Sequence, residues 1–190
     1  NYTPKEFKTE LDWSNWPGVG GGFLGAVEMC NNNGACRKLK GGTMCPSYRV
    51  TRNENDVTRG RANSLRLAIT NQLGADAFTS EEMFNTMRLC VSCKGCQREC
   101  PTGVDMAAMK IEVLAARVRK YGLTLNDRLI SYLPRYASVA SKFPRLMNLR
   151  NRVPVLAKVL ERATGFSAKR PLPDWSTDTF NDRKHPSPAS

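Results

Sequence analysis

Apolar residues recur at helical spacing through most of the chain after residue 57, and no stretch alternates between apolar and polar residues as a half-buried strand would. The stripe Leu65, Ala68, Ile69 and Leu73 is typical of a helix with one buried face. The longer predicted helices are Thr58–Leu73, a second from Thr79 to about Leu89, and Val104–Tyr121. Shorter helices are predicted over 125–133, 135–143, 145–151 and 153–164. The pattern therefore predicts an all-α fold.

Residues at the ends of these segments support the predicted boundaries. Thr58 is a suitable N-cap, and Thr79-Ser-Glu-Glu82 has the spacing of a capping box. Pro154 suits a first helical turn, because its missing N–H would have no partner there. Gly122 and Gly165 are suitable stops, since glycine readily adopts the left-handed conformation that ends many helices.

The composition along the chain suggests three parts. Residues 1–29 read as an irregular lead-in from a preceding domain, and Pro17–Gly22 reads as a flexible linker because no strand precedes it. Residues 30–168 form the predicted helical domain, with cysteine loops set between helices, and 169–190 read as an extended tail or linker. The start at Asn1 has no initiator Met and no signal-peptide layout. We therefore expect a piece of a longer polypeptide, with ordinary processing as the alternative.

The net charge of +12 is concentrated in one region of the sequence. Residues 101–170 carry 14 Lys and Arg against 4 Asp and Glu. Such an excess could meet an acidic partner, an anionic membrane surface or nucleic acid, or it could be a solvated helix face. No apolar run approaches the roughly 20 residues of a membrane span. The seven cysteines, an odd number, argue against a closed disulfide framework.

Four cysteines lie in the run Cys90-Val-Ser-Cys93-Lys-Gly-Cys96-Gln-Arg-Glu-Cys100-Pro101. This is the spacing of bacterial ferredoxins, in which three thiolates bind one 4Fe–4S cluster and the fourth binds another. Gly95 leaves room for backbone to pass close by, and Pro101 ends the loop. A structural zinc site is the alternative, although zinc sites usually use two separated cysteine pairs.

A second, less regular set precedes this run. Cys30, Asn33 and Cys36 keep the interval of three, with Asn33 in the slot of the middle cysteine, and Cys45-Pro46 repeats Cys100-Pro101. We therefore expect Cys45, Cys90, Cys93 and Cys96 to hold one cluster. The cysteines left for a second cluster are Cys30, Cys36 and Cys100. The alternative is a single cluster with the spare cysteines as buried thiols.

The motifs around these cysteines resemble a known family. They are Cys30-Asn-Asn-Asn-Gly-Ala-Cys36-Arg-Lys, Gly42-Thr-Met-Cys45-Pro-Ser-Tyr-Arg, Thr58-Arg-Gly-Arg-Ala-Asn63 and Leu89-Cys-Val-Ser-Cys-Lys-Gly-Cys96. This pattern resembles the iron–sulfur region of FAD-linked oxidases of the D-2-hydroxyacid dehydrogenase type, which act on D-lactate, glycolate or D-2-hydroxyglutarate. The resemblance implies an alpha-helical ferredoxin-like fold that receives electrons from an FAD domain. No dinucleotide fingerprint or flavin domain is present in these residues, so we expect no substrate site on this chain.

The resemblance also implies partners. We expect the FAD domain of the same polypeptide or complex, and an acceptor such as a quinone or a redox protein, with no nucleic acid. We expect a cytoplasmic location, with peripheral contact at the inner membrane as an alternative. A competing hypothesis is a structural zinc protein whose basic segment binds nucleic acid. A third is a stand-alone subunit of a heterodisulfide-reductase-like or glycerol-phosphate-dehydrogenase-like complex. Arg59, Arg61 and Arg66 could offset the charge of a cluster, raise its reduction potential, dock the flavin domain or form an ordinary basic helix face.

Overall fold

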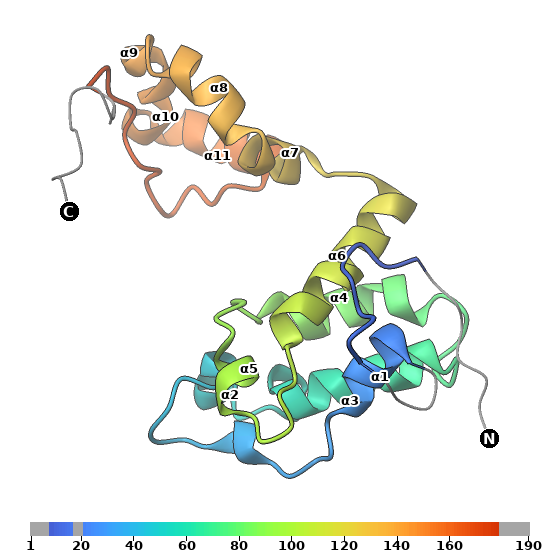
Figure 1. Ribbon diagram of the computed structural model, residues 1–190. Coiled ribbons are helices and arrows are strands. Elements are labelled where there is room, and N and C mark those ends of the chain that lie inside the picture. Colours follow the sequence, from blue (N-terminus) through green and yellow to red (C-terminus); the bar gives the residue numbers. More distant parts are fainter. Residues whose placement is uncertain (1–7, 17–20, 179–190) are drawn as a thin grey trace, which may run out of the picture. The chain divides into compact units, whose positions relative to one another are not determined.

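The computed structural model describes residues 8–16 and 21–178. Two compact units divide the chain, residues 1–122 and residues 123–190, and each is described by itself (Figure 1). These units do not follow the three predicted parts, because the boundary falls at Gly122, inside the predicted 30–168 domain. Most of the predicted linker Pro17–Gly22 and the end of the predicted tail, from residue 179, lie outside the described residues.

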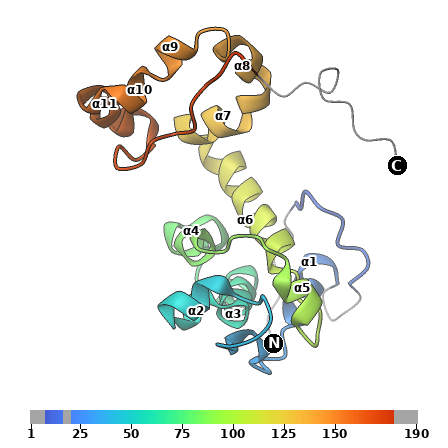
Figure 2. The ribbon, with the colours of Figure 1, turned by 90° about the vertical axis from the view of Figure 1, so that its left-hand side faces the viewer.

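The first unit is built from helices joined by loops (Figures 1 and 2). Its α-helices are α1 (Gly22–Glu28), α2 (Pro46–Thr51), α3 (Thr58–Ile69), α4 (Glu81–Arg88), α5 (Gly95–Glu99) and α6 (Met106–Tyr121). Short 3₁₀ turns are η1 (Ala35–Arg37), η2 (Glu54–Asp56) and η3 (Ala77–Thr79). The described residues contain helices and no strands, so the all-α prediction is confirmed, while the ferredoxin-like detail stays a prediction.

The long helices begin close to where the sequence predicts, but two predicted caps are wrong. Ser80, not Thr79, caps α4, and its hydroxyl oxygen accepts from the Met83 N–H at 3.1 Å. Thr58 is the first residue of α3 and makes no cap bond, because its N–H and hydroxyl both face Cys45. The Thr58 side chain therefore contacts the Cys45 sulfur instead of capping the helix.

The core of the first unit lies where α1, α3, α4 and α6 pack together. Helix α1 lies in the predicted irregular lead-in, so that part of the prediction is wrong; it buries Phe23, Leu24 and Val27 and contacts α3. Helix α3 contributes Leu65, which is fully buried. Met87 of α4 and Met106, Met109 and Val113 of α6 complete this core.

A buried carboxylate fastens the segment before α1 to helix α6. Glu112 is fully buried, and its two oxygens accept from the backbone N–H groups of Glu10 and Leu11, each at 2.8 Å. The indole N–H of Trp13 donates to the same carboxylate at 2.9 Å. These three donors stabilise a charge that burial would otherwise penalise heavily. They also hold residues 10–13 in a fixed place, although the sequence predicts only an irregular lead-in there.

The second unit contains α7 (Leu125–Ser131), α8 (Leu133–Ala140), α9 (Pro144–Met147), α10 (Leu149–Arg152) and α11 (Pro154–Thr164). The chain after α11 returns along α10, so the predicted tail is docked up to residue 175. Arg150 donates to the carbonyl of Ser167 at 2.8 Å, and Asn151 to that of Leu172 at 2.8 Å. Asn148 and Trp175 exchange two hydrogen bonds. None of the described helices in either unit combines the length and apolar character needed to cross a membrane.

Candidate metal centre

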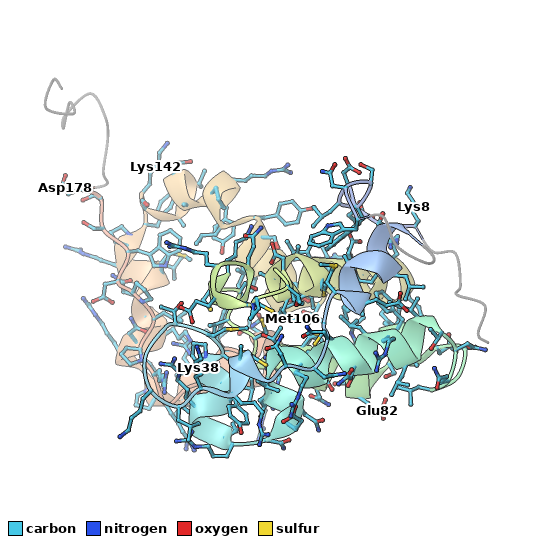
Figure 3. The ribbon with its side chains drawn as sticks, turned by 60° about the horizontal axis from the view of Figure 1, so that its bottom comes forward. Lys8, Lys38, Glu82, Met106, Lys142 and Asp178 are labelled. Carbon is cyan, nitrogen blue, oxygen red and sulfur yellow. The ribbon has the colours of Figure 1, made fainter. Side chains whose placement is uncertain are left out.

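One pocket of the first unit brings together four cysteines from two distant segments. Its walls include Cys45 from the start of α2, Cys90 and Cys93 from the loop before α5, and Cys96 from the first turn of α5. These are the four residues that the spacing assigns to one cluster. Arg61 and Met106 also line the pocket, and Figure 3 shows Met106 in the interior of the first unit, whereas Lys38 and Glu82 lie at its periphery. All seven cysteines are free thiols.

Glu99 joins the two segments that carry these cysteines. Its carboxylate accepts from the backbone N–H and the hydroxyl of Thr43 at 2.6 and 2.7 Å, and from the N–H of Met44 at 3.2 Å. These bonds lower the pKa of Glu99, chiefly through the hydroxyl of Thr43. The residue before Cys45 is thus fixed to α5, which begins between Cys93 and Cys96.

Gly95 makes this approach sterically feasible. A Cβ at Gly95 would lie 2.8 Å from Thr43 Oγ1, 3.2 Å from the Thr43 carbonyl carbon and 3.3 Å from the Met44 nitrogen. The sequence predicts that Gly95 leaves room for passing backbone. The backbone that passes is the Thr43–Met44 segment, which places Cys45 beside the ferredoxin-like run.

The sulfur of Cys45 is held by Thr58. The Thr58 N–H donates to Cys45 Sγ at 3.2 Å, and the Thr58 hydroxyl lies 2.9 Å from the same sulfur. Cys45 itself has a left-handed backbone, with φ of 49°. Non-glycine residues rarely adopt this conformation, and it often occurs at functional sites. An N–H group directed at the sulfur is the kind of contact that a metal-bound cysteine accepts, so this arrangement suits a metal ligand.

The loop Cys90–Cys96 shows the same backbone feature twice. Ser92 and Lys94 have φ of 53° and 56°, so a residue with left-handed backbone conformation lies between Cys90 and Cys93 and another between Cys93 and Cys96. Burial raises the pKa of Cys96, the N–H of Met106 opposes this shift, and the nearby Asp105 and Cys45 add to it. The protein surroundings alone therefore disfavour a thiolate at Cys96. A cationic metal centre would supply the missing positive charge, so the donor set fits an iron–sulfur cluster.

The other predicted set is arranged differently. Cys36 is buried, and burial raises the pKa of its thiol to about 11, while the N–H of Arg59 lowers it and the charges of Cys45 and Cys30 raise it further. Burial also raises the pKa of Cys100, but hydrogen bonds from Thr102, Gly103 and Val104 outweigh it, and the net shift is downward. The turn η1, which contains Cys36, contacts α5, which immediately precedes Cys100.

Asn33, in the slot of the missing cysteine, is exposed and makes local hydrogen bonds. Its side-chain oxygen accepts from the Ala35 N–H at 2.8 Å, and its amide nitrogen donates to Asn31 at 2.5 Å. Within the part of the chain that the structure describes, no three His, Cys, Asp or Glu side chains are grouped closely enough to hold a single metal ion. The assignment of individual ligands therefore stays a prediction.

Sequence reasoning missed the residues that support the cysteines. The sequence predicts Thr58 only as a helix cap, and it gives no signal for Glu99 or Glu112, because their partners lie far away in the chain. Arg61 was one of three arginines on a predicted helix face, but it is buried and lines the cysteine pocket. The sequence signal for Arg61 is its position four residues before Leu65, on the apolar side of the predicted helix.

Comparison with known proteins agrees with this geometry. Residues 26–104, which contain all seven cysteines, match the 4Fe–4S dicluster domain model. The chain carries an iron–sulfur domain. Its residue pattern and its relatives together confirm the predicted resemblance to the iron–sulfur region of D-2-hydroxyacid dehydrogenases.

The relatives are D-2-hydroxyglutarate dehydrogenases. The protein of Escherichia coli K12 is 25% identical, with 76% of this chain and 18% of the relative covered. That of Pantoea ananatis is 27% identical, with 66% and 16% covered. That of Haemophilus influenzae is 22% identical, with 76% and 17% covered. The chain thus spans less than a fifth of the length of these relatives. No solved structure matches it significantly.

Proposed function

We propose that this chain is an electron-transfer module that holds 4Fe–4S clusters between a flavin domain and an electron acceptor. The observation that carries the proposal is the pocket shared by Cys45, Cys90, Cys93 and Cys96. The match of residues 26–104 to a dicluster domain supports a second cluster at Cys30, Cys36 and Cys100. A bound cluster would take up and release single electrons, which is chemistry that protein side chains do not supply.

In this proposal the residues of the chain bind, tune and shield the clusters. The four cysteines of the pocket provide thiolates, and Thr58 directs its N–H and hydroxyl at one of them. Glu99 keeps the Cys45 segment on α5, so the two ligand segments stay together. Met106 contributes a buried apolar side chain to the wall of the pocket.

The electron donor is proposed from the relatives. Because they are named D-2-hydroxyglutarate dehydrogenases and are far longer than this chain, we propose that an FAD domain outside these residues oxidises a 2-hydroxy acid. Electrons from the reduced flavin would then pass one at a time to the clusters, and on to a quinone or a redox protein. The cytoplasmic location and the peripheral contact with the inner membrane remain predictions.

The cluster assignment is tested by iron and acid-labile sulfide per chain, with electron paramagnetic resonance, on protein prepared without oxygen. Two 4Fe–4S clusters give about eight irons, and one gives about four. We expect Cys93→Ser to remove the cluster of the pocket and Cys36→Ser to affect only the second cluster. Gln97→Ala, at an exposed position of α5, is the matched control and should leave both signals unchanged. Zinc without sulfide in the wild-type chain would overturn the proposal.

The proposed relay is tested in the full polypeptide that contains this chain. D-2-hydroxyglutarate is added without oxygen, and the paramagnetic signal of reduced clusters is followed with the flavin absorbance. We expect both to change in the wild type. In Cys93→Ser the flavin should still be reduced while the signal of the pocket cluster is absent. Flavin reduction in the wild type with no cluster signal would contradict the relay.

A further inference from the structure

A buried arginine lies at the wall of the cysteine pocket. Arg61 comes from the first turn of α3, is 1% exposed and lines the pocket together with Cys45, Cys90, Cys93 and Cys96. A guanidinium is charged at every physiological pH, so burial cannot neutralise it by loss of a proton. Its positive charge therefore acts on the pocket through a medium that screens it poorly.

The charge of Arg61 is paired only loosely, because neither of its hydrogen-bond partners is charged. Its Nε donates to the Thr86 carbonyl at 2.8 Å, and one terminal nitrogen donates to the Ser47 hydroxyl at 3.2 Å. Both of these partners are neutral. The carboxylate of Asp56 lies 3.7 Å from the guanidinium, which is a loose ion pair without a hydrogen bond. A buried cation held mainly by neutral groups gains stability when negative charge develops nearby.

Two other cations near the cysteines are placed differently. Lys94 also lines the pocket, but its side chain is 61% exposed, so water and salt screen its charge. Arg59 is less exposed, and its Nε forms a tight pair with Glu54 at 2.6 Å, which offsets its charge. Of these three cations, Arg61 alone combines burial, a loose ion pair and a place at the pocket wall.

We propose that Arg61 raises the reduction potential of the cluster held by Cys45, Cys90, Cys93 and Cys96. Reduction adds one electron, and therefore one negative charge, to a centre already surrounded by four thiolates. The fixed positive charge of Arg61 stabilises the reduced state more than the oxidised state, so the equilibrium moves toward reduction. The carboxylate of Asp56, 3.7 Å from the guanidinium, opposes this effect. The inference rests on the proposed function, because it requires a cluster in this pocket.

The test is an anaerobic redox titration of the isolated chain, with dithionite as the electron donor and the paramagnetic signal of the pocket cluster as the readout. We expect Arg61→Met to lower the equilibrium constant for one-electron reduction at least tenfold, which is about 59 mV toward negative potential. Arg61→Lys keeps the positive charge, so its pocket cluster should have a reduction potential close to that of the wild type. Asp56→Asn should move the potential in the opposite direction. Arg59→Met is the matched control and should change the equilibrium constant for reduction of the pocket cluster less than threefold.

The opposite signs expected for Arg61→Met and Asp56→Asn separate an electrostatic role from a structural one. A merely structural arginine would let both variants lower cluster content without moving the potential in opposite directions, and that result would overturn the inference. If Arg61→Met fails to retain a cluster, the potentials of Arg61→Lys and Asp56→Asn test the inference instead. An unchanged potential in Asp56→Asn would then contradict the electrostatic role of Arg61. A wild-type chain with no iron in the pocket would instead overturn the proposed function.

Discussion

Thr58 contacts Cys45 Sγ twice, through its backbone N–H at 3.2 Å and through its hydroxyl at 2.9 Å. The next residue continues the pattern, because the N–H of Arg59 lowers the pKa of Cys36. Two consecutive peptide groups at the start of α3 thus support one sulfur from each predicted cluster. The first turn of a helix has unpaired N–H groups and a partial positive charge, both of which favour thiolates.

Replacing Thr58 with Val should lower the reduction potential of the pocket cluster. The change removes the hydroxyl and keeps the shape and the backbone N–H. We expect a shift on the order of 40 mV toward negative potential, which corresponds to about 1 kcal/mol for one electron. Redox titration checks this, and Thr58→Ser, which retains a hydroxyl, should titrate like the wild type. Equal potentials in the Val and Ser variants would show that the hydroxyl does not act on the cluster.

Replacing Gly95 with Ala should weaken cluster binding. The new methyl group would press against Thr43 and Met44, and the segment that carries Cys45 would have to move. We expect a loss of about 1–3 kcal/mol of folding stability, together with lower iron and sulfide per chain. Thermal unfolding and iron analysis check both. Gln97→Ala, an exposed site on the same helix, serves as the control, and full iron content in Gly95→Ala would refute the steric argument.

Glu112→Gln should destabilise the first unit. The amide has one acceptor oxygen instead of two, so at least one of the Glu10, Leu11 and Trp13 donors would meet an N–H group. We expect a loss of about 2–4 kcal/mol, measured by urea unfolding with tryptophan fluorescence. Glu81→Gln removes an exposed partner of Arg117 and should cost less than about 1 kcal/mol. Similar losses in the two variants would mean that the buried network contributes little.

Arg150→Met should release the segment after α11 in the second unit. Arg150 is buried and donates to the carbonyls of Phe166 and Ser167, at 3.2 and 2.8 Å. Without these bonds we expect trypsin to cleave several-fold faster after Lys169, because proteolysis requires the local chain to open. Arg152→Met, at an exposed position of the same helix, should leave the rate unchanged. Equal rates in the two variants would show that Arg150 does not hold this segment.

The part of the fold that sequence could predict is the part that depends on local spacing. Helix α6 begins two residues after the predicted Val104 and ends at the predicted Tyr121, and Gly122 follows it. Its broad apolar face and its glycine stop are both visible in the sequence. The short helices α1, α2 and α5 were not predicted, because five to seven residues carry too little periodicity to be recognised.

For the site, cysteine spacing grouped Cys45 with Cys90, Cys93 and Cys96, and the structure places all four around one pocket. Their role as ligands remains a prediction. The supporting residues could not be predicted, since Glu99 acts on a segment 55 or more residues away and Glu112 on one about 100 residues away. Such contacts depend on tertiary packing, which leaves no periodic trace in the sequence. The buried position of Arg61 likewise appears only once α3 is packed.

The distance along the chain between Cys45 and Cys90 has a consequence for folding. A cluster bound by both cysteines is a covalent crosslink that closes a loop of about 45 residues, containing α2, α3 and α4. In the chain-entropy description, such a closure removes about 4 kcal/mol of conformational freedom from the unfolded chain. Iron loading would then strengthen the whole first unit, and loss of the cluster to oxygen would loosen helices that touch no iron at all.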